Sequence, residues 1–131
     1  MAKDGRYQIR VQTRDTEHRS AKELALLPNI TFHKGHIESE QYLKEAMENM
    51  EGVYFLANGF AIGEKAETFW SMRAFEIAVQ SGVKFFVFSN LDYALKKGGY
   101  NQKFRCGHYD GKGRVAGKES RAKNFPKCSS F

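Results

Sequence analysis

Two residues near the end of the chain could do chemistry together. His108 and Lys112 lie four residues apart in the sequence HYDGK. A histidine can donate a proton near neutral pH, and a lysine can supply a fixed positive charge. The alternative interpretation is a solvated loop, because glycines at 98, 99, 107, 111 and 113 surround the pair. The sequence alone favours the loop for this segment.

Three further candidates each follow a predicted strand. Arg14 comes after the first strand, and Asn58 and Ser89 come directly after two later, apolar strands. Ligands of open α/β sheets bind at the carboxyl ends of the strands, so these positions are candidates for cofactor contact. The alternatives are that Arg14 is a solvated loop cation and that Asn58 and Ser89 cap turns.

The predicted strands follow two patterns. Residues 7–12 alternate between apolar and polar, which is typical of a strand with one buried face, and 30–32 is a shorter β-branched and aromatic stretch. Residues 53–57 and 85–88 are continuously apolar, which is typical of parallel strands covered by helices on both faces.

Helices are predicted between the strands. One covers 20–27, a second starts at a Ser39 cap and stops at Gly52, and a third runs from about 64 to 81. The buried side of the third is predicted to hold Phe69, Met72, Phe75, Ala78 and Val79. The alternation of strands and helices predicts an α/β fold with a doubly wound parallel sheet.

The predicted sheet is incomplete. No glycine-rich turn of the dinucleotide-binding kind precedes or follows the strand at 7–12, so the pattern corresponds to a Rossmann-like sheet that lacks its first strand and phosphate loop. In that fold the first strand is central, so the strands at 7–12 and 53–57 are expected to pair directly or to leave open, aggregation-prone edges. A shortened isoform, a degenerate paralogue and a misplaced gene boundary would each explain this.

Composition predicts one globular domain over 1–115 and a basic, disordered tail over 116–131. The net charge is +6, and from Lys112 onward six cations face only Glu119, a local charge of +5. Such a run is more often a solvated terminus than a nucleic-acid site, so direct nucleic-acid binding is not expected. The absence of a long apolar run predicts a soluble protein of the cytoplasm or nucleus with no membrane contact.

No metal site is predicted. His33 and His36 are three residues apart, but no compact zinc-ligand spacing links them to Cys106, His108 or Cys128. The two cysteines are expected to be free thiols.

Five segments in this order resemble the NmrA-like family, a group of atypical short-chain dehydrogenase/reductase proteins. They are YQIRVQTRD, FHKGHIE, GVYFLANGF, AVQSGVKFFVFSNL and HYDGKGRV, over roughly residues 5–115. The resemblance implies a Rossmann-type domain that binds NAD(P) and is followed by a smaller C-terminal substrate domain. It also implies that Arg14 accommodates the 2′-phosphate of NADP, with NAD as the alternative cofactor.

The same resemblance assigns roles to the HYDGK segment. It is similar to the tyrosine-x-x-x-lysine pair of short-chain dehydrogenases, with His108 in the tyrosine position and Lys112 as the residue that contacts the nicotinamide ribose. His36 stands where the family often has aspartate, which weakens the expected adenine-side contacts. A histidine in place of the tyrosine speaks against ordinary hydride transfer.

Three functions follow as alternatives. The first is a nucleotide-responsive regulator whose NADP occupancy alters contacts with a transcription factor or another protein partner. The second is an NADP-dependent oxidoreductase, which would use His108 and Lys112 as catalytic residues. The third is a truncated fragment without independent activity, and sequence alone does not choose among them.

Overall fold

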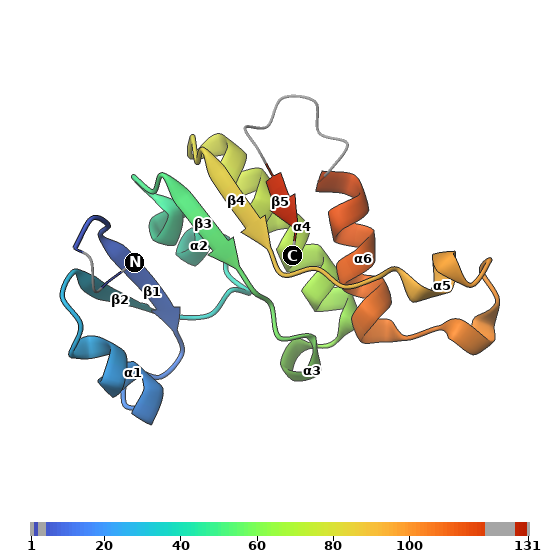
Figure 1. Cartoon of the computed structure of the whole chain (residues 1–131), viewed down its shortest axis with the longest axis horizontal. Helices are drawn as coiled ribbons and strands as arrows, with labels where there is room; N and C mark the ends of the chain where they lie inside the picture. Colours follow the sequence, from blue (N-terminus) through green and yellow to red (C-terminus); the bar gives the residue numbers. More distant parts are fainter. Residues whose placement is uncertain (1, 3–4, 120–127, 131) are drawn as a thin grey trace. The chain divides into compact units, whose positions relative to one another are not determined.

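The computed structural model describes residues 2, 5–119 and 128–130. It divides into two compact units, Met1–Ala46 and Met47–Phe131 (Figure 1). Within the described residues the strands form two separate parallel sheets. No helix in these ranges is long and apolar enough to cross a membrane.

The first unit is a β-α-β-α arrangement. Strand β1 (Ile9–Thr13) pairs in parallel with β2 (Ile30–Lys34), and the register joins Ile9 to Ile30. Helix α1 (Arg19–Ala25) connects the two strands, and helix α2 (Glu40–Met47) follows them and runs to the unit boundary. The parallel pairing and the α/β order agree with the sequence prediction.

Helix α2 is held at both ends by contacts that its sequence supplies. The hydroxyl of Ser39 accepts a hydrogen bond from the backbone N–H of Tyr42 at 3.3 Å, so the predicted cap is confirmed. At the other end the Arg10 guanidinium donates to the carbonyls of Glu45 and Ala46, at 2.8 and 3.1 Å. A cation on the last carbonyls of a helix satisfies groups that have no partner within the helix.

The second unit has a three-stranded parallel sheet in the order β3-β4-β5. Its strands are β3 (Gly52–Phe55), β4 (Phe85–Phe88) and β5 (Cys128–Ser130). Its helices are α3 (Gly59–Ile62), α4 (Glu64–Gln80), α5 (Ala94–Lys97) and α6 (Gly107–Glu119), with a 3₁₀ turn η2 (Gln102–Phe104). Figure 1 shows α4 and α6 side by side on one side of this sheet.

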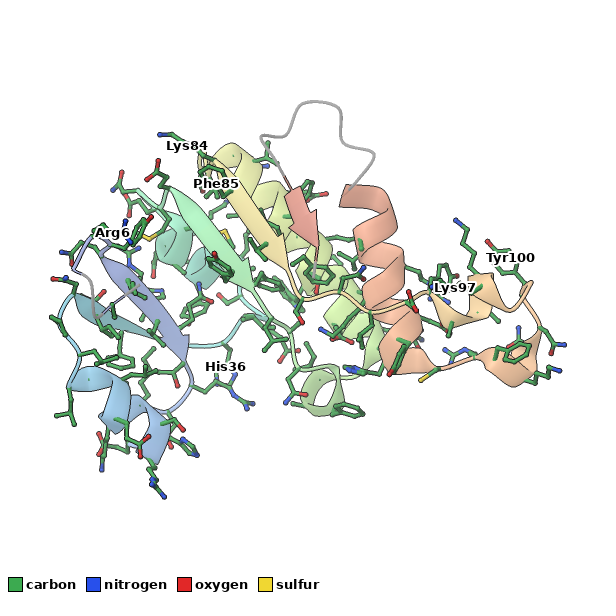
Figure 2. All side chains as sticks on the ribbon, viewed as in Figure 1. Arg6, His36, Lys84, Phe85, Lys97 and Tyr100 are labelled. Carbon is green, nitrogen blue, oxygen red and sulfur yellow. The ribbon has the colours of Figure 1, made fainter. Side chains whose placement is uncertain are left out.

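Two predictions about burial in this unit are wrong. Tyr54 of β3 is 70% exposed and Phe85 of β4 is also exposed, so the described residues do not cover both faces of these strands (Figure 2). In α4 the predicted burial of Ala78 is confirmed, but the predicted Phe69 and Val79 are exposed, and the helix also buries Glu67, Ser71, Ala74 and Ile77.

The glycine-rich segment after β4 also differs from its prediction, because residues 107–119 form helix α6 and not a loop. Glycine lowers helix propensity, but tertiary packing overrides propensity when the glycine has a packing role. A Cβ at Gly113 would lie 2.5 Å from the backbone nitrogen of Tyr93, and one at Gly111 would lie 3.2 Å from Oγ1 of Thr68. These glycines let α6 lie against the chain around Tyr93 and against α4.

The basic tail predicted over 116–131 is described only in part. Helix α6 continues through residues 117–119, and residues 128–130 form β5, which pairs in parallel with β4 from Phe86 opposite Cys128. The rest of the predicted tail, residues 120–127 and 131, lies outside the described residues.

A matched pair of alanine substitutions in α6 tests this packing. We expect Gly113→Ala to lower the free energy of unfolding by about 1–3 kcal/mol, because the new methyl group meets backbone that cannot move aside. Gly117→Ala is the control, since among the described residues no atom beyond its chain neighbours and its own helix backbone lies within 4 Å of the position of its Cβ, and it should stabilise the helix by about 0.5–1 kcal/mol. Denaturant unfolding measures both, and equal effects would contradict the packing role of Gly113.

A second prediction concerns Tyr42, which is buried in the first unit. Its hydroxyl donates to the carbonyl of His33 at 2.9 Å, and burial raises the pKa of the phenol above its ordinary value of 10.0. The folded state therefore holds the Tyr42 proton more tightly than the unfolded state does. The contribution of this group to the free energy of unfolding is complete below pH 10 and is lost as the pH rises through the folded-state pKa.

We expect Tyr42→Phe to cost about 1 kcal/mol at neutral pH and to remove part of the stability loss above pH 10. Denaturant unfolding at neutral and alkaline pH measures both effects. The same fall in stability above pH 10 in the variant and the parent would contradict the assignment.

Candidate functional site

The candidate site forms where α6 reaches the carboxyl ends of β3 and β4. Because α6 is a helix, His108 and Lys112 are one turn apart and lie on the same face. Both approach the side chain of Glu67 on α4. The structure therefore brings the two predicted residues together in an ordered element, although the loop expected for them is wrong.

Lys112 points into the unit and is only 2% exposed. Its ammonium donates to the backbone carbonyl of Ala57 at 3.0 Å, lies 3.0 Å from Oε1 of Glu67 and stands 5.6 Å from the centre of the Phe88 ring. Ala57 precedes Asn58 and Phe88 precedes Ser89. The ammonium thus lies at the strand ends that the sequence marks as a ligand-binding edge.

Glu67 is the functional side chain that the sequence prediction missed. It is completely buried, and its Oε2 lies 3.8 Å from Nδ1 of His108. The turn at Gly59 makes room for it, since a Cβ at Gly59 would overlap the Glu67 carboxylate. A buried carboxylate needs a positive partner, and the Lys112 ammonium supplies it.

His108 forms the outer side of this cluster. Its ring is half-buried and packs against the ring of Phe60, with 4.3 Å between the ring centres. Phe60 belongs to the short helix α3 and is 81% exposed. An exposed aromatic ring on an imidazole, directly outside a buried ion pair, is an arrangement that can accept a flat ligand group.

Asn58 and Ser89 follow β3 and β4, and each makes a hydrogen bond within the second unit. The side chain of Asn58 accepts a hydrogen bond from the N–H of Phe60 at 3.2 Å, so it caps α3. The sequence offers such a capping role as the alternative to cofactor contact. The N–H of Ser89 donates to the carbonyl of Phe55 at 3.1 Å and continues the ladder between β4 and β3. Neither contact uses the Ser89 hydroxyl.

A set of polar contacts fixes the start of α6. The buried carboxylate of Asp110 accepts from the N–H groups of Leu95 and Cys106, at 2.9 and 3.1 Å. Arg114 donates to the Tyr93 hydroxyl at 3.1 Å, and this hydrogen bond is the main cause of the raised pKa of its guanidinium. Glu64 of α4 pairs with both Arg105 and Arg114.

Arg14 belongs to the first unit. It is exposed and follows directly after β1, at the carboxyl end of that strand as predicted. In the same unit, His33 stacks on Tyr42 with 4.6 Å between the ring centres, whereas His36 is exposed (Figure 2). Among the described residues, no group of His, Cys, Asp and Glu could hold a metal ion.

The described residues suit one end of a dinucleotide better than the other. Asn58 and Ser89 lie at the strand edge where ligands of open α/β sheets bind, and the Lys112 ammonium at this edge is buried against Glu67. A pyrophosphate needs a glycine-rich turn leading into a helix, and the turn from β1 to α1 contains no glycine. After β3, Gly59 packs on the Glu67 carboxylate, which would repel a phosphate.

Solved structures share this arrangement of strands and helices. A crystal structure of NmrA, a negative transcriptional regulator, matches 98% of this chain with a TM-score of 0.78 at 14% identity. A mutant NmrA matches 95% with a TM-score of 0.74 at 15% identity, and the protein gox2253 matches 97% with a TM-score of 0.70 at 17% identity. These similarities define the chain as an α/β protein of the Rossmann-like class.

The particular family follows from the sequence comparison. The model of the NmrA-like family matches residues 1–129, so the chain belongs to the NmrA-like family. It spans 38%, 44% and 36% of the NmrA, gox2253 and mutant NmrA chains, respectively. No curated protein sequence matches it.

Removing the Lys112 charge tests the role of the buried pair. We expect Lys112→Met to lower the free energy of unfolding by about 3–5 kcal/mol, because Glu67 is left as an uncompensated buried charge. Adding Glu67→Gln to that variant should recover part of the loss.

Lys65→Met, at an exposed position of α4, is the control and should change stability by less than about 0.5 kcal/mol. Denaturant unfolding measures all variants. A Lys112→Met variant as stable as the control would show that the ion pair does not support the fold.

Proposed function

We propose that this chain is a nucleotide-responsive regulatory protein, in which NADP occupancy alters contacts with a transcription factor. Membership of the NmrA-like family supports nucleotide binding, and the likeness to NmrA, a negative transcriptional regulator, supports the regulatory part. Action in the cytoplasm or nucleus is part of this proposal. The observation that carries the proposal is the Lys112 ammonium held at the carboxyl ends of β3 and β4.

In this proposal the ligand contacts are assigned to each unit by itself, with Lys112, Asn58 and Ser89 in the second unit and Arg14 in the first. Lys112 binds ribose hydroxyls, and Asn58 and Ser89 line the nicotinamide end. Arg14 pairs with the 2′-phosphate, because a guanidinium can bind a phosphate through two parallel hydrogen bonds. The exposure of Arg14 leaves its guanidinium accessible to such a ligand. NAD, which lacks that phosphate, should bind more weakly.

An oxidoreductase of the NADP-dependent kind is the second candidate. The observation that favours it is that His108 and Lys112 share one face of α6, as a proton donor and its neighbouring cation must. Against it, His108 stands in the position where short-chain dehydrogenases have the tyrosine that donates the proton. Oxidation of NADPH that requires an added carbonyl substrate, and that Lys112→Arg slows, would support this candidate over the regulator.

Calorimetric titration with NADP⁺ and NAD⁺ tests the proposal. We expect saturable binding of NADP⁺, weaker binding of NAD⁺, and a loss of NADP⁺ affinity of about 10- to 100-fold in Arg14→Gln. NAD⁺ affinity should not change in that variant. Lys22→Gln removes another exposed cation from the first unit and is the matched control.

Two outcomes would overturn this assignment. If neither nucleotide binds to folded protein, the chain is better described as a fragment without independent nucleotide-dependent activity. If Arg14→Gln and Lys22→Gln lower NADP⁺ affinity equally, Arg14 is an ordinary solvated cation and does not read the 2′-phosphate.

A further inference from the structure

A basic and aromatic segment projects from the second unit between β4 and α6. We call residues 94–105 the basic lobe; they include α5 and the turn η2 (Figure 1). The lobe contains Lys96, Lys97, Lys103 and Arg105 and no acidic residue. Its charge is therefore +4, although the net charge of the whole chain is only +6.

The lobe is anchored to the rest of the unit at its base. Leu95 is buried, and its N–H donates to the buried carboxylate of Asp110 at 2.9 Å. At the other end, Arg105 pairs with Glu64 of α4 at 2.6 Å. Because both ends are held, the lobe presents its outer side chains in a defined arrangement.

The outer part of the lobe exposes two aromatic rings. Tyr100 is 61% exposed and Phe104 is 47% exposed. Tyr100 also has a φ of 61°, a left-handed conformation that is uncommon for a bulky residue. Exposed aromatic residues held in an unfavourable backbone conformation are more typical of binding surfaces than of ordinary loops.

Only part of the positive charge is neutralised within the chain. Lys97 pairs with Asp92, and Arg105 pairs with Glu64. In the part of the chain that the structure describes, neither Lys96 nor Lys103 pairs with a carboxylate, and the Lys103 ammonium lies over the Phe104 ring at 4.7 Å. Lys97 and Tyr100 are both at the surface of the lobe (Figure 2).

We propose that the basic lobe docks an acidic segment of a partner protein, with Tyr100 and Phe104 contacting apolar side chains and Lys96 and Lys103 contacting carboxylates. Aromatic residues at the centre of a surface with cations around them are typical of protein interfaces. The inference deepens the proposed regulatory function, on which it rests, by giving the chemistry of the partner.

The ring environment favours a protein segment over a single-stranded nucleic acid. Base stacking needs a free ring face. The Phe104 ring already contacts Gly98 and lies under the Lys103 ammonium, and Tyr100 makes an edge contact with Tyr93 at 6.4 Å between ring centres. Apolar side chains of a peptide can pack against the remaining ring surface without displacing these contacts.

Fluorescence anisotropy with a labelled peptide of alternating glutamate and leucine tests the inference. We expect saturable binding that weakens with salt, and no binding of the same peptide with glutamine in place of glutamate. The double variant Lys96→Glu/Lys103→Glu should weaken binding by roughly tenfold or more. Lys84→Glu, at the opposite end of β4 from the lobe, is the matched control and should leave affinity within about twofold.

A second variant separates the ring from the charge. Tyr100→Asn removes the aromatic side chain, but asparagine tolerates the left-handed backbone, so the lobe should keep its conformation. We expect a loss of peptide affinity of about fivefold or more in this variant. Unchanged affinity in both lobe variants, or tighter binding of an oligothymidylate than of the acidic peptide, would overturn the inference.

The outcome is distinguishable from that of the proposed function. Peptide binding is measured without nucleotide, and NADP⁺ binding is measured on the same preparation by calorimetry. Nucleotide binding without peptide binding overturns the docking surface alone. Peptide binding without nucleotide binding supports the docking surface and removes the nucleotide response.

Discussion

The buried ion pair between Glu67 and Lys112 is the interaction on which the second unit depends. Both side chains are almost completely buried, and the ammonium also holds the carbonyl of Ala57 at the end of β3. One contact therefore links α4, α6 and the sheet. Removal of either charge leaves the other buried without a partner, which is far more costly than the loss of an exposed pair.

The ion pair requires close helix packing, and glycine provides it. Gly59 leaves space for the Glu67 carboxylate, and Gly111 and Gly113 let α6 approach α4 and the chain around Tyr93. The same packing places His108 beside Glu67 and against Phe60. The geometry of the candidate site is thus a consequence of how the two helices pack, and it does not depend on a flexible loop.

Much of the backbone arrangement could be predicted from the sequence. Strands β3 and β4 are short apolar runs, which are typical of buried parallel strands. The Ser39 cap follows from the local preference of serine for the start of a helix. Ser89 directly follows β4 and Asn58 lies three residues after β3, so both are near the carboxyl ends of parallel strands.

The missed features arise from tertiary contacts. Four glycines in α6 argue against a helix when they are considered locally, and contacts with α4 and Tyr93 explain three of them, Gly107, Gly111 and Gly113. Glu67 looks like a surface residue of an ordinary helix, and the large apolar residues of α4 suggested a different buried face. The signal that could have revealed the buried face is the spacing of the small residues Ser71, Ala74 and Ala78.

The central claim is that Lys112, held by Glu67 at the strand ends, forms the ribose side of a nucleotide site. The most direct measurement is the NMR resonance of its side chain in protein with ¹³C-labelled lysine, assigned with Lys112→Arg and followed during addition of NADP⁺. The account predicts a saturable shift of this resonance at the concentrations at which calorimetry detects binding. Saturable NADP⁺ binding that leaves the Lys112 resonance unmoved would contradict it.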